Sequence, residues 1–368
     1  MSMRYQAGVL TASYFPLKTP DAPTIGTASQ PLTGAISTTF TAPSNVGGGA
    51  ITGYTAVATD SSSGATFTGT GASSPITVSG LTTGNTYTVK VFATNAFGAG
   101  PLSGASNSVT MAVIVVGQQA YTTAGTYSWV APTGVTSVSV VAVGGGGGCC
   151  PYYGTAGGGG GLGYKNNYTV TPGSSYTVVV GAIGTTNPNF NGDIAGTAGG
   201  DSYFVSTAVV KGGGGAGGPN ASAGAAGGTY TGDGGGNGGG YTPAGYSGGS
   251  GAGGYAGDGG RGSANTTVYP GSGGGGAGGI QFYGGGGVGI LGQGTSGTSN
   301  AQGGSGGANG TAWGGSAGTV TPTGGDYGGG AGYSGGTNNG GGQGGVGAVR
   351  IIWPSTTRSF PSTNTGDL

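Results

Sequence analysis

The sequence predicts an all-β protein in which a two-sheet sandwich precedes a glycine-rich domain framed by strands. Residues 86–93 alternate apolar and polar side chains, which is the pattern of a strand with one buried face. The 368 residues include 101 glycines and 17 prolines, a composition that excludes an ordinary helical protein. Hydrophobic residues make up 34% of the chain, which argues against disorder.

Composition changes along the chain divide it into four parts. Residues 1–21 form an N-terminal attachment segment, 22–113 the sandwich, 114–353 the glycine-rich domain and 354–368 a C-terminal tail. Prolines at positions 16, 20 and 23 predict an extended linker between the first two parts.

The sandwich is predicted from short strands that are separated by turn residues. The runs are 35–41, 51–58, 76–81, 86–94 and 106–113. In the fourth run Tyr87, Val89, Val91 and Ala93 share one face, as a strand packed on a second sheet requires.

Residues 81–103 carry a resemblance to a known family. Leu81 stands six positions before Tyr87, and the run 89–95 is followed by Gly-Ala-Gly-Pro-Leu-Ser at 98–103. This pattern resembles the penultimate strand and following loop of a fibronectin type III domain. The resemblance implies that the Tyr87 hydroxyl ties down a corner of the sandwich. Two positions depart from it: Phe40 replaces the usual core tryptophan, and Thr83 replaces a frequent proline.

The glycine-rich domain begins and ends with apolar strands. Its predicted strands are 127–131, 135–143, 168–170, 176–180, 203–211 and 349–353, and glycine clusters fill most of residues 212–347. A flexible linker is one interpretation, but linkers do not usually alternate with Tyr, Trp and Ile or return to an apolar strand. We favour an ordered polyglycine II bundle, in which extended threefold helices lie close enough to hydrogen-bond sideways.

A second resemblance rests on the Val-Ser-Val-Val-Ala-Val-Gly run at 138–144, the Gly-Gly-Asp-Ser-Tyr-Phe segment at 199–204, the glycine clusters and the closing strand at 347–353. Together they look like glycine-rich domains of phage structural proteins, and are similar to the tail-fibre-tip adhesins of T-even-like phages. The resemblance implies a glycine-rich scaffold whose loops bind a host receptor.

Charge and residue types exclude several functions. Only 4% of residues are charged, the net charge is zero and histidine is absent, so nucleic acid is a poor partner and acid–base catalysis lacks its usual groups. Neither a membrane span nor a spaced metal-binding pattern is found. We therefore expect no enzyme activity, no cofactor, no metal and no membrane insertion.

Aromatic side chains in the glycine-rich domain are the candidate contact residues. Tyr, Ser, Gly and Asn together are typical of binding loops. The alternative is that the same rings cover the glycine faces as core. The predicted receptor-binding residues are Tyr152, Tyr153, Phe190, Tyr246, Tyr255, Phe282, Tyr283, Trp313 and Tyr333. The adjacent Cys149 and Cys150 form either two buried thiols or a strained vicinal disulfide.

These observations predict a phage virion protein, of a tail fibre or fibre tip, found on the virion surface and outside the host after lysis. Its expected partners are a host cell-surface receptor, an outer-membrane protein or a polysaccharide, and other virion or fibre subunits through the N-terminal segment. The alternative is a self-assembling fibre subunit with no receptor role, for which a homo-oligomer is expected.

Overall fold

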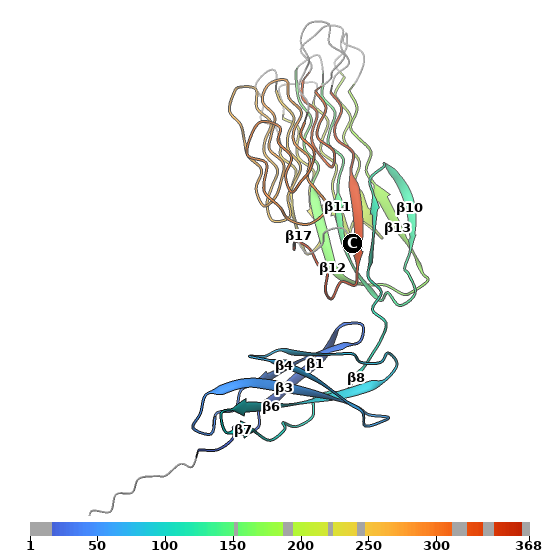
Figure 1. The fold of residues 1–368 in the computed structure, drawn as a ribbon. Coiled ribbons are helices and arrows are strands. Elements are labelled where there is room, and N and C mark those ends of the chain that lie inside the picture. The colour runs from blue at the N-terminus through green and yellow to red at the C-terminus, as the bar shows by residue number, and fades with distance from the viewer. Residues whose placement is uncertain are drawn as a thin grey trace, which may run out of the picture. The chain divides into compact units, whose positions relative to one another are not determined.

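The chain folds into two compact units, Met1–Ile114 and Val115–Leu368, each described here by itself. The computed structural model describes residues 17–150, 154–186, 194–219, 224–240, 247–310, 322–333 and 342–362. Within those ranges every regular element is a β-strand, which confirms the all-β prediction (Figure 1).

The first unit is a sandwich of two antiparallel sheets. One sheet has the order β1-β2-β5, and the other has the order β4-β3-β6-β7 with β8 also paired to β6. The strands are β1 (Thr24–Leu32), β2 (Ala35–Thr41), β3 (Ile51–Asp60), β4 (Thr66–Gly71), β5 (Ile76–Ser79), β6 (Thr86–Asn95), β7 (Gly98–Ala99) and β8 (Val109–Thr110).

The side chains between the sheets follow the predicted alternation. Tyr87, Val89, Val91 and Ala93 of β6 are all fully buried in one apolar cluster. The Tyr87 hydroxyl accepts a hydrogen bond of 3.0 Å from the Thr82 backbone N–H, so the predicted corner is confirmed. Phe40 is buried in the same cluster, 4.7 Å from the ring of Tyr54.

The strand predicted at 106–113 is wrong over most of its length, because only β8 pairs there. Along β6, two serine hydroxyls accept backbone hydrogen bonds that the carbonyls of a paired strand would otherwise accept. The Val91 N–H donates to the Ser103 hydroxyl and the Val89 N–H to the Ser106 hydroxyl, both at 2.9 Å. Side-chain acceptors thus replace the carbonyls that a continuous strand would supply.

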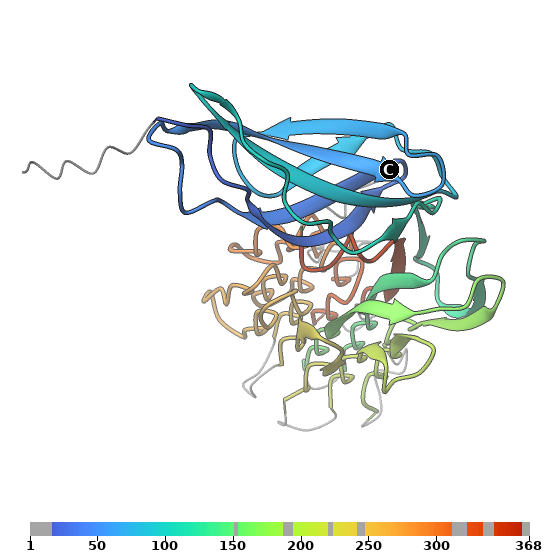
Figure 2. The ribbon, with the colours of Figure 1, turned by 90° about the horizontal axis from the view of Figure 1, so that it is seen from below.

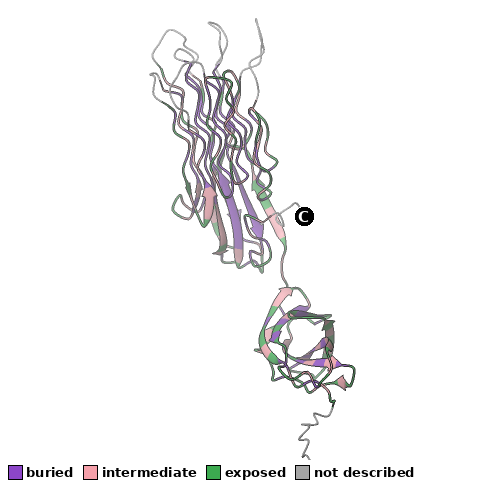
Figure 3. Cartoon of the chain, turned by 90° about the vertical axis from the view of Figure 1, so that its left-hand side faces the viewer, coloured by how far each residue is buried: buried purple, intermediate pink, exposed green. Residues whose placement is uncertain are grey.

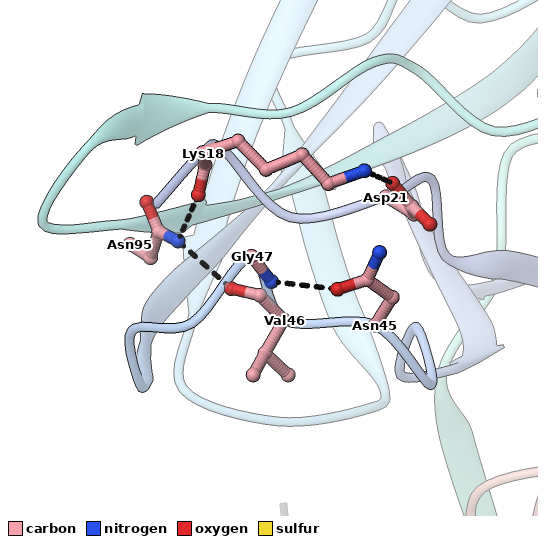
Figure 4. Close-up of polar contacts among 6 residues, drawn as sticks. All are labelled: Lys18, Asp21, Asn45, Val46, Gly47 and Asn95. Carbon is pink, nitrogen blue, oxygen red and sulfur yellow. Dashed lines mark hydrogen bonds and ion pairs between the residues drawn. The ribbon is translucent and has the colours of Figure 1, made fainter. Parts of the chain in front are cut away.

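Residues 18–21, within the predicted extended linker, are hydrogen-bonded to the sandwich. Lys18 N–H donates to the Gly47 carbonyl at 2.9 Å, and Asp21 N–H donates to the Asn45 carbonyl at 3.0 Å. The Asn95 amide donates to the carbonyls of Lys18 and Val46, at 2.9 and 2.8 Å (Figure 4). These bonds fix the point at which the N-terminal segment joins the first unit.

The second unit contains two five-stranded sheets. Their orders are β10-β13-β14-β15-β16 and β17-β12-β11-β18-β9. The strands are β9 (Gly117–Tyr121), β10 (Gly125–Val130), β11 (Ser137–Val143), β12 (Leu162–Thr169), β13 (Ser175–Val180), β14 (Ser202–Phe204), β15 (Val210–Gly212), β16 (Tyr230–Thr231), β17 (Gly234–Gly236) and β18 (Ala348–Trp353).

Strand β11 is buried on both faces. Val138, Val140 and Ala142 belong to the apolar cluster shared with the β10–β16 sheet. Val141 and Val143 belong to a different cluster, which includes apolar side chains of the glycine-rich segments. The sheet containing β11 is therefore a middle layer, which explains its near-continuous apolar sequence.

The single strand predicted at 203–211 is instead a hairpin. Strands β14 and β15 pair with each other across a turn. Val205, which follows β14, has a left-handed φ of 65° and cannot continue the extended conformation.

Beyond the strands, the glycine clusters form the predicted polyglycine II bundle, seen as wavy tubes side by side in Figure 1 and more nearly end-on in Figure 2. Along residues 144–149 successive backbone N–H groups donate to three neighbouring segments in turn and return to the first after three residues. The pairs are Gly144 to Gly161, Gly145 to Gly200, Gly146 to Gly345, Gly147 to Gly158, Gly148 to Thr197 and Cys149 to Gly342. This period of three is that of the polyglycine II helix.

The carbonyls of the same segment accept from three further directions. Gly215 and Gly218 donate to Gly145 and Gly148, while Gly184 and Ala331 donate to Gly146 and Gly147. Residues 144–149 therefore have neighbours on six sides, and these neighbours satisfy the hydrogen-bonding groups of the buried backbone. Figure 3 shows buried segments in purple within the second unit. We call this array the glycine lattice.

Glycine is required because the backbones approach too closely for a side chain. A Cβ added to Gly159 would overlap the carbonyl of Gly251, far inside van der Waals contact. At Gly240 the nearest atom would lie 3.3 Å away, so that position has more room.

Gly159→Ala should destabilise the second unit by about 1–3 kcal/mol or more, because the new methyl group forces lattice segments apart. Gly240→Ala is the matched control and should change the free energy of unfolding by less than about 1 kcal/mol. Thermal and urea unfolding of both variants measure the difference; equal stability would contradict a close-packed lattice.

Tyr87→Phe should lower the free energy of unfolding of the first unit by about 1 kcal/mol, because the Thr82 N–H loses its acceptor. Tyr54→Phe is the matched control, because it removes a hydroxyl from the same core. Among the described residues this hydroxyl has no hydrogen-bond partner. Urea titration should show a smaller change for the control.

Candidate binding surface

The lattice segments run between the sheets and an opposite end, which we call the distal end. Residues 144–149 lead there from β11, and residues 155–161 return from it to β12. Described residues from several separate segments meet at this end. They are Cys150, Thr155, Thr186, Ile194, Pro219, Ser247, Ile280 to Tyr283, Pro322, Tyr333 and Gly342.

Hydrogen bonds join these segment ends across large distances in sequence. The Thr155 hydroxyl donates to the Pro219 carbonyl and the Thr186 hydroxyl to the Gly342 carbonyl, both at 2.5 Å. The Tyr333 N–H donates to the Ser247 carbonyl at 3.0 Å. The distal end is therefore a framework with fixed backbone positions.

Both cysteines are buried thiols at this end, and they form no disulfide with each other. The Cys149 sulfur lies 3.4 Å from the Thr186 hydroxyl, and the Cys150 thiol donates to the Ile194 carbonyl at 3.4 Å. They hold the ends of two segments together and have the structural role of small buried residues.

Three of the predicted contact residues lie at the distal end. Phe282 is half-buried with its ring 6.0 Å from that of Tyr333, which is 9% exposed. Tyr283 is 38% exposed, and Ile194, whose carbonyl accepts from the Cys150 thiol, is 48% exposed. The described part of this end thus exposes aromatic and apolar side chains.

Tyr255 does not belong to that surface. It is 1% exposed, and its ring stacks on Phe360 at 5.8 Å next to the sheets. Its hydroxyl donates to the Gly289 carbonyl, and burial raises the pKa of that hydroxyl. Here the alternative interpretation, in which tyrosines cover glycine faces as core, is the correct one.

Five predicted contact residues fall outside the described residues. They are Tyr152, Tyr153, Phe190, Tyr246 and Trp313. The described residues on either side of them include Cys150, Ser247 and Pro322, which belong to the distal end.

The distal end as defined above carries no charged side chain among its described residues. The charged groups of the second unit that form ion pairs lie on the sheets or beside them. Lys165 pairs with Asp233, and Lys211 with Asp201 at 3.6 Å. The described residues of the distal end therefore offer apolar area and neutral hydrogen-bonding groups for contact.

A cavity that sequence analysis missed lies beside the edge strand β9. It has a volume of about 400 Å³ and is lined by Gln118, Ala120, Thr122, Gly289, Ile290, Leu291, Ser305, Gly306, Tyr327 and Arg350. Arg350 of β18 is 1% exposed, and its guanidinium donates to the Gln118 side-chain oxygen and, at 3.1 Å, to the Ile290 carbonyl. The cavity could not be predicted from the sequence, because the local sequence shows only an arginine between Val349 and Ile351.

Two residues that line this cavity have left-handed backbones although neither is glycine. Ser305 has a φ of 49° and Tyr327 a φ of 62°. Burial and the nearby Asp326 carboxylate raise the pKa of the Tyr327 hydroxyl. Strained backbones of this kind often accompany a functional constraint.

The described ranges hold no group of three or more His, Cys, Asp or Glu side chains that could bind a metal ion. The same ranges contain no helix long and apolar enough to cross a membrane.

Comparisons with solved structures give partial likenesses. Titin domains A168–A170 are 24% identical with a TM-score of 0.24, over 25% of this chain and 32% of that one. The twitchin kinase region from C. elegans is 21% identical with a TM-score of 0.24, over 25% and 17%. The chicken CNTN1 FN1–FN3 domains are 18% identical with a TM-score of 0.23, over 34% and 47%. The chain thus spans less than half of each of these structures.

No curated protein matches the chain. Two family models do. Residues 21–109 match the fibronectin type III domain, in agreement with the sandwich and its tyrosine corner. Residues 122–354 match the glycine-rich domain. Because that second match covers more than half of the chain, the protein belongs to the family defined by this glycine-rich domain.

Proposed function

We propose that the protein is a phage virion protein, of a tail fibre or fibre tip, that binds a host cell-surface receptor through the distal end of its glycine lattice. The observation that carries the proposal is the meeting of many segment ends on one rigid framework. Connections between rigid elements tolerate sequence variation, and binding residues are frequently placed on them.

The chemistry of the distal end supports binding rather than catalysis. Its described residues provide apolar and aromatic area and neutral hydrogen-bonding groups but no charged side chain. Tyrosine and phenylalanine supply large contact area at low conformational cost. A rigid scaffold also keeps the entropy lost on binding small.

The rest of the chain has a supporting role in this proposal. The N-terminal segment attaches the protein to other virion or fibre subunits, and the fibronectin type III domain acts as a spacer or docking module. Receptors compatible with the proposal are an outer-membrane protein or a polysaccharide.

Tyr283→Ala and Phe282→Ala should each weaken binding to host cells, by about 30-fold where the ring is a central contact. Tyr230→Ala is the matched control, because Tyr230 is 37% exposed but lies on β16, away from the distal end. Binding of labelled protein to cells and competition with phage adsorption measure the effect, while circular dichroism confirms folding.

The same assay extends to Phe190→Ala and Trp313→Ala. If all four candidate variants bind cells as well as the control does, the distal end is not the receptor site. Ordered filaments without cell binding would instead favour a self-assembling fibre subunit, which analytical ultracentrifugation and electron microscopy would detect.

A further inference from the structure

All residues that line the cavity beside β9 belong to the second unit. We propose that this cavity binds one neutral hexose unit of a glycan. None of its lining residues belongs to the distal end, so the proposal does not rest on the receptor function proposed for that end.

The cavity is preformed, because its walls come from separate segments that are bonded to one another. Strand β9 pairs with β18, with Ala120 opposite Arg350. The Arg350 guanidinium donates to the Gln118 side-chain oxygen and to the Ile290 carbonyl, so it joins the sheet to the lattice segment at 289–291. A preformed site loses little conformational entropy when its ligand binds.

The wall on the lattice side is also held in place. The Ser305 hydroxyl donates to the Gly274 carbonyl at 2.8 Å and accepts from the Gly294 N–H at 3.0 Å. The Tyr327 carbonyl accepts from the Val288 N–H at 3.0 Å. These bonds hold Ser305 and Tyr327 in their left-handed conformations, which persist only where the surrounding structure determines them.

The size and the mouth of the cavity suit one sugar ring. Its volume of about 400 Å³ lies near the lower limit of small-molecule sites, which span roughly 300–1,000 Å³. Leu291 is 45% exposed, and Thr122 and Gly306 are also exposed. Ile290 and Ser305 are buried. The cavity therefore has an open rim and a closed floor, so the rest of a glycan chain can leave toward solvent.

The lining has the chemistry that a neutral sugar requires. A sugar ring presents C–H groups on its faces and hydroxyls around its edge, so its site needs apolar area beside neutral donors and acceptors. Ile290, Leu291 and Tyr327 supply the area. The hydroxyls of Thr122 and Tyr327 are hydrogen-bonded to each other. Because a hydroxyl has one donor and two lone pairs, this pair keeps one O–H donor and further acceptors for a ligand.

The charges around the cavity favour a neutral ligand over an anionic one. Arg350 is the single charged residue of the described lining, and each of its guanidinium nitrogens donates to Gln118 or Ile290. Arg350 thus fixes the wall, and contact with the ligand does not require its charge. Burial and the nearby Asp326 carboxylate raise the pKa of the Tyr327 hydroxyl, so an anion at that hydroxyl would meet repulsion.

Titration of the full chain with sugars tests the ligand class, with isothermal titration calorimetry and saturation-transfer NMR as readouts. The neutral probes are methyl α-D-glucopyranoside, methyl α-D-mannopyranoside, methyl β-D-galactopyranoside and N-acetyl-D-glucosamine. At least one of them should bind with a Kd of about 10 mM or tighter. D-Glucuronate should bind more weakly than that sugar. Absence of binding by all four neutral probes in this range, or equal or tighter binding of D-glucuronate, would overturn the proposal.

Substitutions in the full chain test the location. Thr122→Val should weaken binding of the same sugar by about fivefold or more, because a side chain of the same shape lacks the hydroxyl. Tyr327→Phe should also weaken it. Thr123→Val is the matched control and should leave the Kd unchanged, because Thr123 is exposed but does not line the cavity. Circular dichroism confirms that the variants fold. Equal affinity of the Thr122 and Thr123 variants would place the sugar elsewhere and overturn the proposal.

Discussion

The sideways hydrogen bond between glycine backbones is the interaction on which the second unit depends. Each lattice segment satisfies its N–H and C=O groups with several neighbours, as residues 144–149 do. Such bonds contribute about 1 kcal/mol each after competition with water is counted, so many must form together to offset the large backbone entropy of glycine. A methyl group at a position such as Gly159 would separate the backbones and remove several bonds at once.

The sheets set the lattice in place. Strand β11 is buried on both faces and continues directly into residues 144–149, so its register fixes where the first lattice segment begins. Strand β18 closes the domain from the other end of the sequence by pairing with β11 and β9. The same strand places Arg350 beside the cavity, where a buried cation is held by neutral oxygens of Gln118 and Ile290.

A scaffold made mainly of glycine has few side chains of its own, so its chemistry is concentrated where segments end. This constraint separates two kinds of tyrosine. Tyr255, near the sheets, fills space against Phe360. Tyr283, at the distal end, keeps more than a third of its surface exposed. Both occur beside glycine clusters in the sequence, so local composition does not distinguish them.

The sequence by itself determined the all-β class, the alternation of β6 and the ordered glycine bundle, because each follows from local periodicity or from the missing Cβ. The corner role of Tyr87 followed from the resemblance to fibronectin type III domains. The sequence did not determine the hairpin at 203–211, the serine-interrupted pairing at 106–113, the burial of Tyr255 or the cavity at Arg350. Those depend on contacts between residues far apart in sequence. Gln118 and Arg350, for example, meet only because β9 pairs with β18. Only the tertiary structure decides such contacts, since glycine clusters of nearly identical composition carry no local signal of which neighbours they will bind.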